Sequence, residues 1–358
     1  MNPTDPNRAA KTASEINLDG SRFIRACLRQ PVDRTPVWFL RQAGRYMEEY
    51  REVRKHHTLV EICKQPELAA EVTITAAEKL GVDAAIIFAD LLLPLEPMGL
   101  GFEFQAGEGP VVHHPVRTAE DVAALRTDRA EDLAYVAKAI EKVAAHFRNR
   151  LGIIGFCGAP YTLASYMIEG GGSRNYIHTK QMMYSDTATW RSLLDKIVAV
   201  LTEYCRLQVD AGADVIQIFD SWVGSLGLAD YRDYAFEASQ RLIHSVQQMG
   251  VPVIYFGVET AGLLAQMAST GADVIGLDWR QPLDEGWRAV GHGHAVQGNL
   301  DPIMLFAPPG VLEQRVKEIL RAANGRPGHI FNLGHGIVPT TPVENVQAVV
   351  RMVKEFKL

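Results

Sequence analysis

Short apolar runs alternate with amphipathic segments along most of the chain. The stretches 36–40, 84–89 and 152–156 are almost wholly apolar, which is typical of strands buried on both faces of a parallel sheet. In 68–80 and 133–147, by contrast, apolar residues recur every three or four positions, as on one face of a helix. The pattern therefore predicts strands and helices that take turns along the chain.

A similar unit occurs three times: a glycine that would end a helix, a short apolar strand, and an aspartate where the strand ends. These units are 81–90, 212–220 and 271–278. Further strands are expected at 253–257, 295–298 and 329–333, and further helices at 21–28, 228–248, 262–269, 311–323 and 343–356. With 37–40 counted first, the α/β alternation predicts a single (β/α)8 barrel. A doubly wound open sheet is the alternative, but no G-x-G-x-x-G follows the first strand.

No linker-like stretch divides the chain, so we expect one barrel domain over residues 20–358, after a flexible N-terminal tail over residues 1–19. The stretch 101–115 is rich in Gly, His and Pro and predicts a loop or a small hairpin. The last helix has a start signal of its own. Thr341 is expected as its N-cap, Pro342 as its first residue, and Glu344 as the partner that completes a capping box.

Charge and composition narrow the class of protein. The formal charge is −6, from 36 basic and 42 acidic residues, and the chain has no block of basic residues. This argues against a nucleic acid or an anionic membrane as its main partner. No apolar run approaches the length of a membrane span, and residues 1–19 lack the apolar core of a secretory signal. The cysteines are far apart and predict reduced, buried thiols; they are Cys27, Cys63, Cys157 and Cys205. We therefore expect a cytoplasmic protein.

Two arginines follow the first apolar run directly. If 41–46 turns into a helix, Arg41 and Arg45 project from the same face, one turn apart. Paired guanidinium groups at the end of a buried strand would form a clamp for carboxylates or phosphates. The alternative is a pair of ordinary surface arginines.

Reactive groups of a parallel barrel lie at the carboxyl ends of its strands. The residues expected there are Arg41, Arg45, Asp90, 161–166, Asp220, Ser221, Asp278, Arg280, Asn299, Asp301, Asn332, Gly334 and His335. They combine cations that bind carboxylates with acid–base groups, and they include no obvious set of metal ligands.

The three strand-end aspartates have different surroundings in the sequence. Asp90 is followed by an apolar run that offers it no local partner, and an idle buried carboxylate is costly, which favours a functional role. Asp220 and Asp278 suit a structural role, as a cap or in an ion pair, as well as they suit a functional one. His335 stands between two glycines, where the backbone can approach a ligand closely.

Two further motifs are weaker. His292 and His294 suggest a metal site, but no third ligand stands at a recognisable spacing, and an exposed loop is the preferred interpretation. The glycines at 170–172, before Ser173 and Arg174, suit either a phosphate cradle or a mobile loop over the site.

Several blocks of the sequence resemble the uroporphyrinogen decarboxylase family. They are P-V-W-F-L-R-Q-A-G-R-Y at 36–46, I-I-F-A-D at 86–90, F-C-G-A-P-Y-T-L-A-S-Y-M-I-E-G-G-G-S at 156–173, F-D-S-W at 219–222, Q-G-N-L-D-P at 297–302 and N-L-G-H-G-I at 332–337. They occur in the right order from about Asn17 to the C-terminus, so the resemblance is specific.

This resemblance implies a (β/α)8 barrel, a homodimer, and the removal of CO2 from the four acetate side chains of uroporphyrinogen III to give coproporphyrinogen III. It implies no organic cofactor and no metal. The substrate-binding positions that match are Arg41, Gln42, Ala43, Arg45, Asp90, Tyr166, Ser221 and His335. Of these, Asp90, Arg41, Tyr166 and His335 match catalytic positions, with Asp90 facing the pyrrole N–H groups.

Two other functions remain to be weighed. Zinc-dependent corrinoid and thiol methyltransferases resemble the decarboxylases in fold, but they need a ligand set that begins H-x-C, and this chain has no H-x-C. A tetrapyrrole carrier without turnover would have little use for the charge of Asp90.

Overall fold

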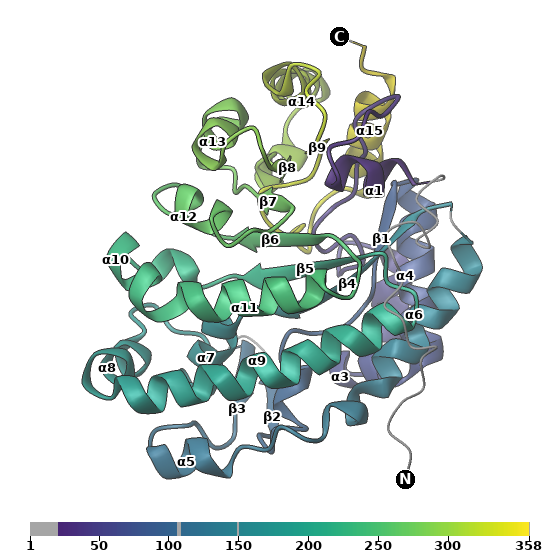
Figure 1. The fold of residues 1–358 in the computed structure, drawn as a ribbon. Coiled ribbons are helices and arrows are strands. Elements are labelled where there is room, and N and C mark those ends of the chain that lie inside the picture. The colour runs from purple at the N-terminus through teal and green to yellow at the C-terminus, as the bar shows by residue number, and fades with distance from the viewer. Residues whose placement is uncertain (1–20, 106–108, 149, 358) are drawn as a thin grey trace, which may run out of the picture.

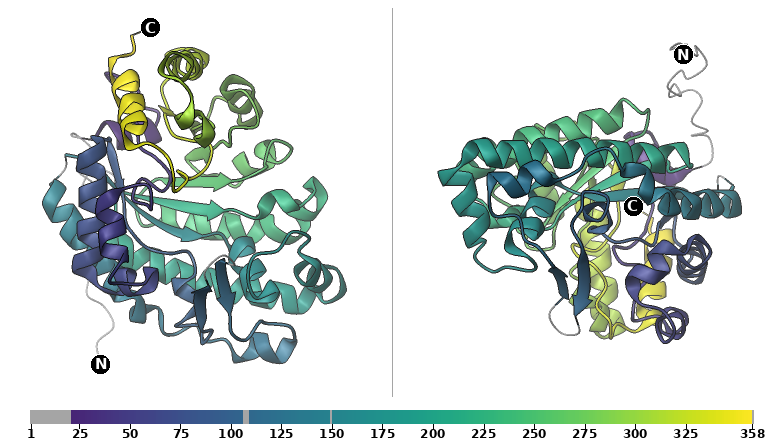
Figure 2. Two further views of the ribbon diagram at one scale, coloured as in Figure 1. Left: turned by 180° about the vertical axis from the view of Figure 1, so that it is seen from behind. Right: turned by 90° about the horizontal axis from the view of Figure 1, so that it is seen from below.

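The structure is a computed structural model that describes residues 21–105, 109–148 and 150–357. The tail expected over residues 1–19 lies outside the described residues. One parallel sheet runs in the order β1, β4, β5, β6, β7, β8, β9 (Figure 1). Its strands are β1 (Ala84–Ile86), β4 (Gly152–Gly158), β5 (Val215–Asp220), β6 (Val253–Gly257), β7 (Val274–Gly276), β8 (Ala295–Gln297) and β9 (His329–Ile330). The sheet curls, and helices surround its outer side (Figure 2).

The α/β class and the parallel sheet are as predicted, but the predicted extent of the first strand is wrong. Within 36–40 only Val37 pairs, in a parallel bridge with Phe331. The backbone N–H of Phe331 donates to the carbonyl of Pro36 at 2.9 Å, and that of Asp83 donates to the carbonyl of Val37 at 2.8 Å. Residues 36–38 therefore lie between the segments that contain β9 and β1.

The recurring Gly-x-Asp units fasten neighbouring strands to each other. Their glycines have φ angles of 68°, 107° and 89°, a left-handed conformation that suits glycine at the end of a helix. The aspartate of each unit accepts a backbone N–H from near the start of the neighbouring segment or strand. The pairs are Asp83 with Val37, Asp214 with Ile153, and Asp273 with Val253. The segment at Val37 is thus held in the same way as β4 and β6.

Most predicted helices form close to their predicted bounds. The helices are α1 (Arg22–Cys27), α2 (Glu48–Arg54), α3 (Leu59–Lys64), α4 (Pro66–Leu80), α5 (Ala119–Ala124), α6 (Ala134–Phe147), α7 (Pro160–Glu169), α8 (Ile177–Ser185), α9 (Thr187–Asp210), α10 (Leu228–Asp230), α11 (Phe236–Gln247), α12 (Leu264–Ala268), α13 (Leu283–Val290), α14 (Pro309–Ala323) and α15 (Val343–Glu355). The single helix predicted over 228–248 is interrupted by a π-helical turn, Tyr231–Ala235. The hairpin predicted within 101–115 is confirmed as β2 (Phe102–Gln105) and β3 (Gly109–Val112).

The capping box predicted for α15 is wrong. Pro342 is the N-cap rather than the first helical residue, and no side chain caps the helix. The Thr341 hydroxyl is instead buried without a hydrogen-bond partner among the described residues. Since Thr341 lies one residue before the cap, its hydroxyl does not reach the N–H groups that a cap would satisfy.

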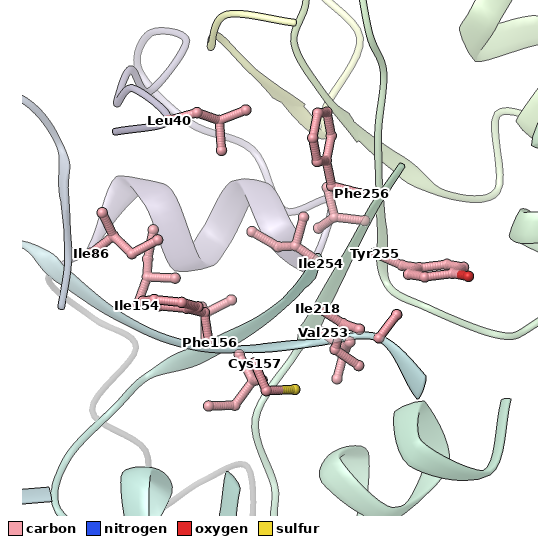
Figure 3. Packing of buried hydrophobic residues seen from close by; sticks show 14 of the residues in the cluster. Leu40, Ile86, Ile154, Phe156, Cys157, Ile218, Val253, Ile254, Tyr255 and Phe256 are labelled. Atoms are coloured by element: carbon pink, nitrogen blue, oxygen red, sulfur yellow. The ribbon is translucent and has the colours of Figure 1, made fainter. Parts of the chain in front are cut away.

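One buried cluster of apolar side chains joins the sheet to its helices. On one face of the sheet, the side chains that gather are Leu40, Ile154, Phe156, Ile254 and Phe256 (Figure 3). Cys157 and Tyr255 occupy the alternate positions of β4 and β6 and point away from that group (Figure 3). Neighbouring residues of a strand end therefore face different environments. No helix of the described chain is long and apolar enough to cross a membrane.

Candidate active site

The two arginines that follow the first apolar run lie on a loop. The prediction that Arg41 and Arg45 share a helical face is wrong, because α2 begins only at Glu48 and Arg41 has a left-handed φ of 60°. The turn is fixed at Leu40. Its N–H donates to Asn332 Oδ1 at 2.9 Å, and its carbonyl accepts the N–H of Ile337 at 3.0 Å. These bonds to the segment after β9 bend the chain before a helix can start.

The glycines on either side of His335 make room for neighbouring protein groups. A Cβ at Gly336 would lie 2.7 Å from Cγ and 2.8 Å from Nε of Arg41, so this arginine packs directly on the glycine backbone. A Cβ at Gly334 would overlap the backbone nitrogen of Trp279. The close approach expected around His335 therefore exists, but protein groups already occupy it.

Asp90 is half-buried beyond the end of β1. The expectation that it has no local partner is wrong, since the N–H of Leu92 donates to Asp90 Oδ1 at 2.9 Å. Burial raises the pKa of the Asp90 carboxyl to about 6, while the Leu92 N–H and the positive charge of Arg41 act to lower it. The charge of Arg41 thus acts on Asp90, although the two residues are 49 positions apart in the chain.

Tyr166 stands on α7, and its ring meets the ring of Trp222 edge-on at 5.6 Å. Burial raises the pKa of the Tyr166 hydroxyl to about 12; the charge of Asp90 adds to this rise in the pKa, and the charge of Arg41 opposes it. Tyr166 therefore belongs to the same electrostatic cluster as Asp90 and Arg41, and its phenol stays protonated at neutral pH.

His335 joins this cluster from the other side. Burial lowers its pKa below the ordinary value, and the nearby cations Arg41 and Arg280 lower the pKa further. Its ring meets that of Trp279 edge-on at 6.1 Å. The imidazole is therefore neutral at pH 7. Arg41 acts on Asp90, Tyr166 and His335 alike and is the residue that connects them.

The other four predicted positions have different surroundings. Gln42 is buried, and its amide donates to the carbonyl of Ala84 at 3.2 Å, so the fold uses this side chain. Ala43 borders a small cavity of about 30 Å³ between α2 and α4. The Arg45 side chain is exposed, and Ser221 is half-buried directly after β5.

Arg45 and Asp90 share an electrostatic neighbour. Burial raises the pKa of Tyr50 to about 12; the charge of Arg45 acts to lower this pKa, and the charge of Asp90 acts to raise it. Both charges therefore act on Tyr50, and the Arg45 guanidinium has no hydrogen bond among the described residues.

The remaining strand-end aspartates are part of the framework. Asp278 is buried, accepts the Arg280 guanidinium at 2.9 Å, and also accepts the backbone N–H of Glu259 at 2.5 Å. Asp220 is fully buried and accepts hydroxyl hydrogen bonds from Thr162 and Tyr255, each at 2.7 Å. For Asp278 the structure shows the structural role that the sequence left open, as the ion-pair partner of Arg280.

Trp222 and Trp279 contact site residues and were not among the residues predicted from the sequence, whereas Thr162 fell within the predicted range 161–166. Trp222 stood within the F-D-S-W block, which was the only signal for it. Trp279 follows a strand-end aspartate, and the Arg280 guanidinium lies 4.0 Å over its ring. Their contacts with Tyr166 and His335 join segments that are far apart in the chain, so no local pattern reveals them.

The residues of the two weaker motifs have different surroundings. His294 Nδ1 lies 2.9 Å from the carbonyl of Ala272, whereas His292 is exposed beside Trp287. Gly170 and Gly171 join the β2–β3 hairpin, through a 2.8 Å bond from the N–H of Val112 and a bridge to Val111. No three His, Cys, Asp or Glu side chains within the described ranges cluster as possible metal ligands.

A cavity of about 540 Å³ lies between α13 and α14, and none of the clustered residues lines it. It is an open surface depression lined mostly by charged side chains, among them Arg288, Arg321 and Arg326. The electrostatic coupling at the strand ends is the stronger sign of a site, because it joins groups from four separate segments.

Comparison with known proteins shows the family of this chain. The family model described as "Uroporphyrinogen decarboxylase (URO-D)" matches residues 19–356. This chain belongs to the uroporphyrinogen decarboxylase family. A uroporphyrinogen decarboxylase from Koribacter versatilis (strain Ellin345) is 62% identical over 337 residues, covering 94% of this chain and 96% of the relative. One from Solibacter usitatus (strain Ellin6076) is 54% identical over 337 residues, covering 94% and 98%.

Solved structures show the same fold in proteins of other names. A methyltransferase from Methanosarcina mazei has a TM-score of 0.75 at 22% identity, and the match covers 96% of this chain and 98% of the other. A B12-independent methionine synthase from Shewanella sp. W3-18-1 has a TM-score of 0.55 at 9% identity, covering 84% and 89%. At these identities the likeness concerns the fold of this decarboxylase-family chain and not its chemistry.

Proposed function

We propose that this chain removes CO2 from the four acetate side chains of uroporphyrinogen III and forms coproporphyrinogen III, without a metal or an organic cofactor. Relatives that carry this name are 62% and 54% identical over 94% of the chain. The observation that carries the proposal is the cluster in which Arg41 is electrostatically coupled to Asp90, Tyr166 and His335.

The substrate can supply its own electron sink. Each acetate is a carboxylate on a methylene that is attached to a pyrrole ring. When a ring carbon takes up a proton, the bond to the carboxylate can break, and its electron pair moves into the cationic ring as CO2 leaves. A second protonation at the methylene and the loss of the ring proton leave a methyl group. Each acetate thus consumes one proton and releases one CO2.

Asp90 is assigned the stabilisation of the cationic ring. As an anion it would accept the N–H groups of the macrocycle, and the charge that develops on the protonated pyrrole would strengthen those bonds. The half-buried position makes this charge effective, because little water screens it. The pKa of about 6 describes a site without substrate. Bound N–H donors would lower that pKa and keep the carboxylate charged.

The arginines are assigned the substrate carboxylates. Arg41 is held against Gly336, so its guanidinium enters the site with part of its conformational freedom already lost. Arg45 is exposed and can meet a carboxylate at the rim. Gln42 and Ala43 are assigned backbone contacts, since the Gln42 amide is already bonded to β1.

Tyr166, Ser221 and His335 are assigned the remaining polar contacts. The Tyr166 phenol is protonated and can donate a hydrogen bond to a carboxylate. A neutral His335 can do the same through one ring nitrogen. A proton that reaches the ring carbon has to come through one of these donors, through Arg41, or from water.

The proposal extends to the architecture and the setting of the enzyme. Residues 36–38, which are bonded to Phe331 and Asp83, would take the place of the eighth strand and close a (β/α)8 barrel in one domain. A homodimer in the cytoplasm is proposed with it. The four cysteines are free and buried, which suits a reducing compartment.

The first test is turnover by metal-stripped protein. Purified protein is incubated with uroporphyrinogen III under reducing conditions in the dark, and the oxidised products are separated by their number of carboxyl groups. A ladder that ends at four carboxyl groups is expected. Binding without any CO2 release would replace the proposal with a carrier. No binding, together with stoichiometric zinc in the protein as purified, would favour a methyltransferase.

A further inference from the structure

Asp220 has an unusual position for a strand-end carboxylate. It is the last residue of β5, is 0% exposed, and has hydroxyl groups rather than a cation as its hydrogen-bond partners. Along β5, Gln217 is bonded to Gln297 of β8 in the interior of the curl, and Asp220 has the opposite parity. Its side chain therefore faces the helices, where it meets Thr162 of α7. A buried carboxylate of this kind is costly unless its hydrogen bonds are used.

Thr162 connects Asp220 to the segment that follows β5. The Thr162 hydroxyl donates its single proton to Asp220 Oδ1 at 2.7 Å, which leaves a lone pair free. That lone pair accepts the backbone N–H of Trp222 at 3.2 Å. The carboxylate therefore sets the direction of the threonine hydroxyl, and the hydroxyl fixes the backbone between Ser221 and Trp222.

Thr162 and Trp222 each help to hold Tyr166 in place. Thr162 stands four residues before Tyr166, which is one turn of α7, so anchoring Thr162 fixes the helix that carries Tyr166. Trp222, anchored through its N–H, places its ring edge-on against the Tyr166 ring at 5.6 Å, and the ring of Tyr176 lies tilted against it at 5.9 Å. Tyr166 is thus held from its own helix and from its aromatic neighbour by the same carboxylate.

The second oxygen of Asp220 extends the network. Tyr255 of β6 donates its hydroxyl proton to Asp220 Oδ2 at 2.7 Å. The same hydroxyl lies 3.3 Å from those of Tyr231 and Ser239. Tyr231 opens the π-helical turn before α11, and such turns often occur near functional sites. Asp220 therefore joins β5, β6, α7 and the start of α11 directly behind the proposed site.

We infer that Asp220 and Thr162 are positioning residues for decarboxylation, which act by holding Tyr166 and the 221–222 segment in their working arrangement. This inference rests on the function proposed above. A positioning role differs from a purely structural one in that the loss of the Thr162 hydroxyl should lower turnover mainly through Tyr166.

The test is a double-mutant cycle. Thr162→Val keeps the shape of the side chain but removes the hydroxyl, and it should lower kcat/KM for uroporphyrinogen III by about tenfold or more, because small displacements in a site are costly. Thr162→Ser restores a hydroxyl and should restore most of the activity. In a Tyr166→Phe background, Thr162→Val should cost far less than it does alone, because coupled residues are non-additive.

Two further variants separate positioning from folding. Thr270→Val is a matched control, since Thr270 is also buried and its hydroxyl donates to the carbonyl of Met267, away from the site. It should leave kcat/KM unchanged. If Thr162→Val does not fold, Asp220→Ala takes its place in the cycle, because it removes the acceptor of the Thr162 hydroxyl. Asp220→Asn should be less harmful, because its side-chain oxygen can still accept that hydroxyl.

The outcomes are distinct. Effects of Thr162→Val and Tyr166→Phe that simply multiply, or an unchanged kcat/KM in Thr162→Val, would overturn the positioning role while the wild type still decarboxylates. A wild-type protein that releases no CO2 would overturn the proposed function itself, and the positioning role with it.

Discussion

The side chain of Arg41 lies across Gly336, in the space that a Cβ at position 336 would occupy. Gly336→Ala would place a methyl group 2.7 Å from Cγ and 2.8 Å from Nε of Arg41, so the arginine must move. Gly336 has no left-handed φ, so the added strain is steric rather than conformational. We expect kcat/KM to fall by about tenfold to a hundredfold.

The measurement is steady-state kinetics on uroporphyrinogen III, with thermal unfolding recorded in parallel. Gly262→Ala is the matched control, because a Cβ at Gly262 meets no atom within 4 Å. An unchanged kcat/KM in Gly336→Ala would show that the position of Arg41 does not matter for the reaction.

Asp90→Asn should keep the fold and lose most of the turnover, because an amide cannot supply the negative charge opposite the cationic ring. For the wild type, the anion is the active form. Its carboxyl has a pKa of about 6 in the free protein, so kcat/KM should fall as the pH drops through about 6. A pH profile of kcat/KM checks this. Near-normal activity of Asp90→Asn would remove Asp90 from its assigned role.

Asp220 makes the stability of the fold depend on pH. Burial raises its pKa from an ordinary 3.8 to about 6, so between these pH values the folded chain binds more protons at this site than the unfolded chain does. The contribution of Asp220 to stability is therefore fully present below pH 4 and is lost as the pH rises through about 6. The loss is roughly 3 kcal/mol, at about 1.4 kcal/mol per pH unit.

Asp220→Asn removes this titration. The free energy of unfolding of each protein is measured in denaturant titrations. From pH 4 to pH 8, the value for Asp220→Asn should rise relative to that of the wild type by roughly 3 kcal/mol. A difference between the two proteins that stays constant across this range would mean that Asp220 does not titrate there.

Arg280 should control the protonation of His335. Burial and the charges of Arg41 and Arg280 lower the pKa of His335, while Asp278 acts to raise it. Arg280→Gln removes one cation and leaves Asp278 without its 2.9 Å partner, so the pKa of His335 should rise. An NMR titration of the imidazole C2–H resonance measures it, and His335→Asn assigns that resonance among the 11 histidines. An unmoved or lower pKa would contradict this account.

Asp83 should be a strong contributor to stability at the other end of the sheet. It is buried, lies 2.7 Å from Arg34 and 3.1 Å from Arg22, and accepts the N–H of Val37. Asp83→Ala would leave these partners without their hydrogen-bond acceptor. It should lower the free energy of unfolding by about 3 kcal/mol or more.

Asp33→Ala is the control for this change. Asp33 is exposed and pairs with the same Arg22 at 2.6 Å, and exposed pairs contribute at most about 1 kcal/mol. Chemical denaturation of both variants gives the comparison. If both variants lose the same free energy of unfolding, the buried bonds of Asp83 to Val37 and Arg34 contribute no more to stability than the exposed pair of Asp33 with Arg22.

The alternation of apolar runs and amphipathic segments determined the α/β class, the parallel strands and most helices, because burial on two faces or on one leaves a local periodic pattern. The glycines at 81, 212 and 271 marked helix ends correctly, since a left-handed φ favours one residue type. Local sequence also placed Asp90, Tyr166 and His335 near strand ends.

Which strand-end groups share a site depends on how distant segments pack. Within β5, Gln217 faces the interior and Asp220 faces the helices, yet a strand buried on both sides gives no sign of which parity points inward. The loop at Arg41 forms because Leu40 is bonded to Asn332 and Ile337, almost three hundred residues away in the chain. Side-chain period and helix signals are local, whereas the electrostatic coupling of Arg41 to Asp90, Tyr166 and His335 depends on contacts between distant segments.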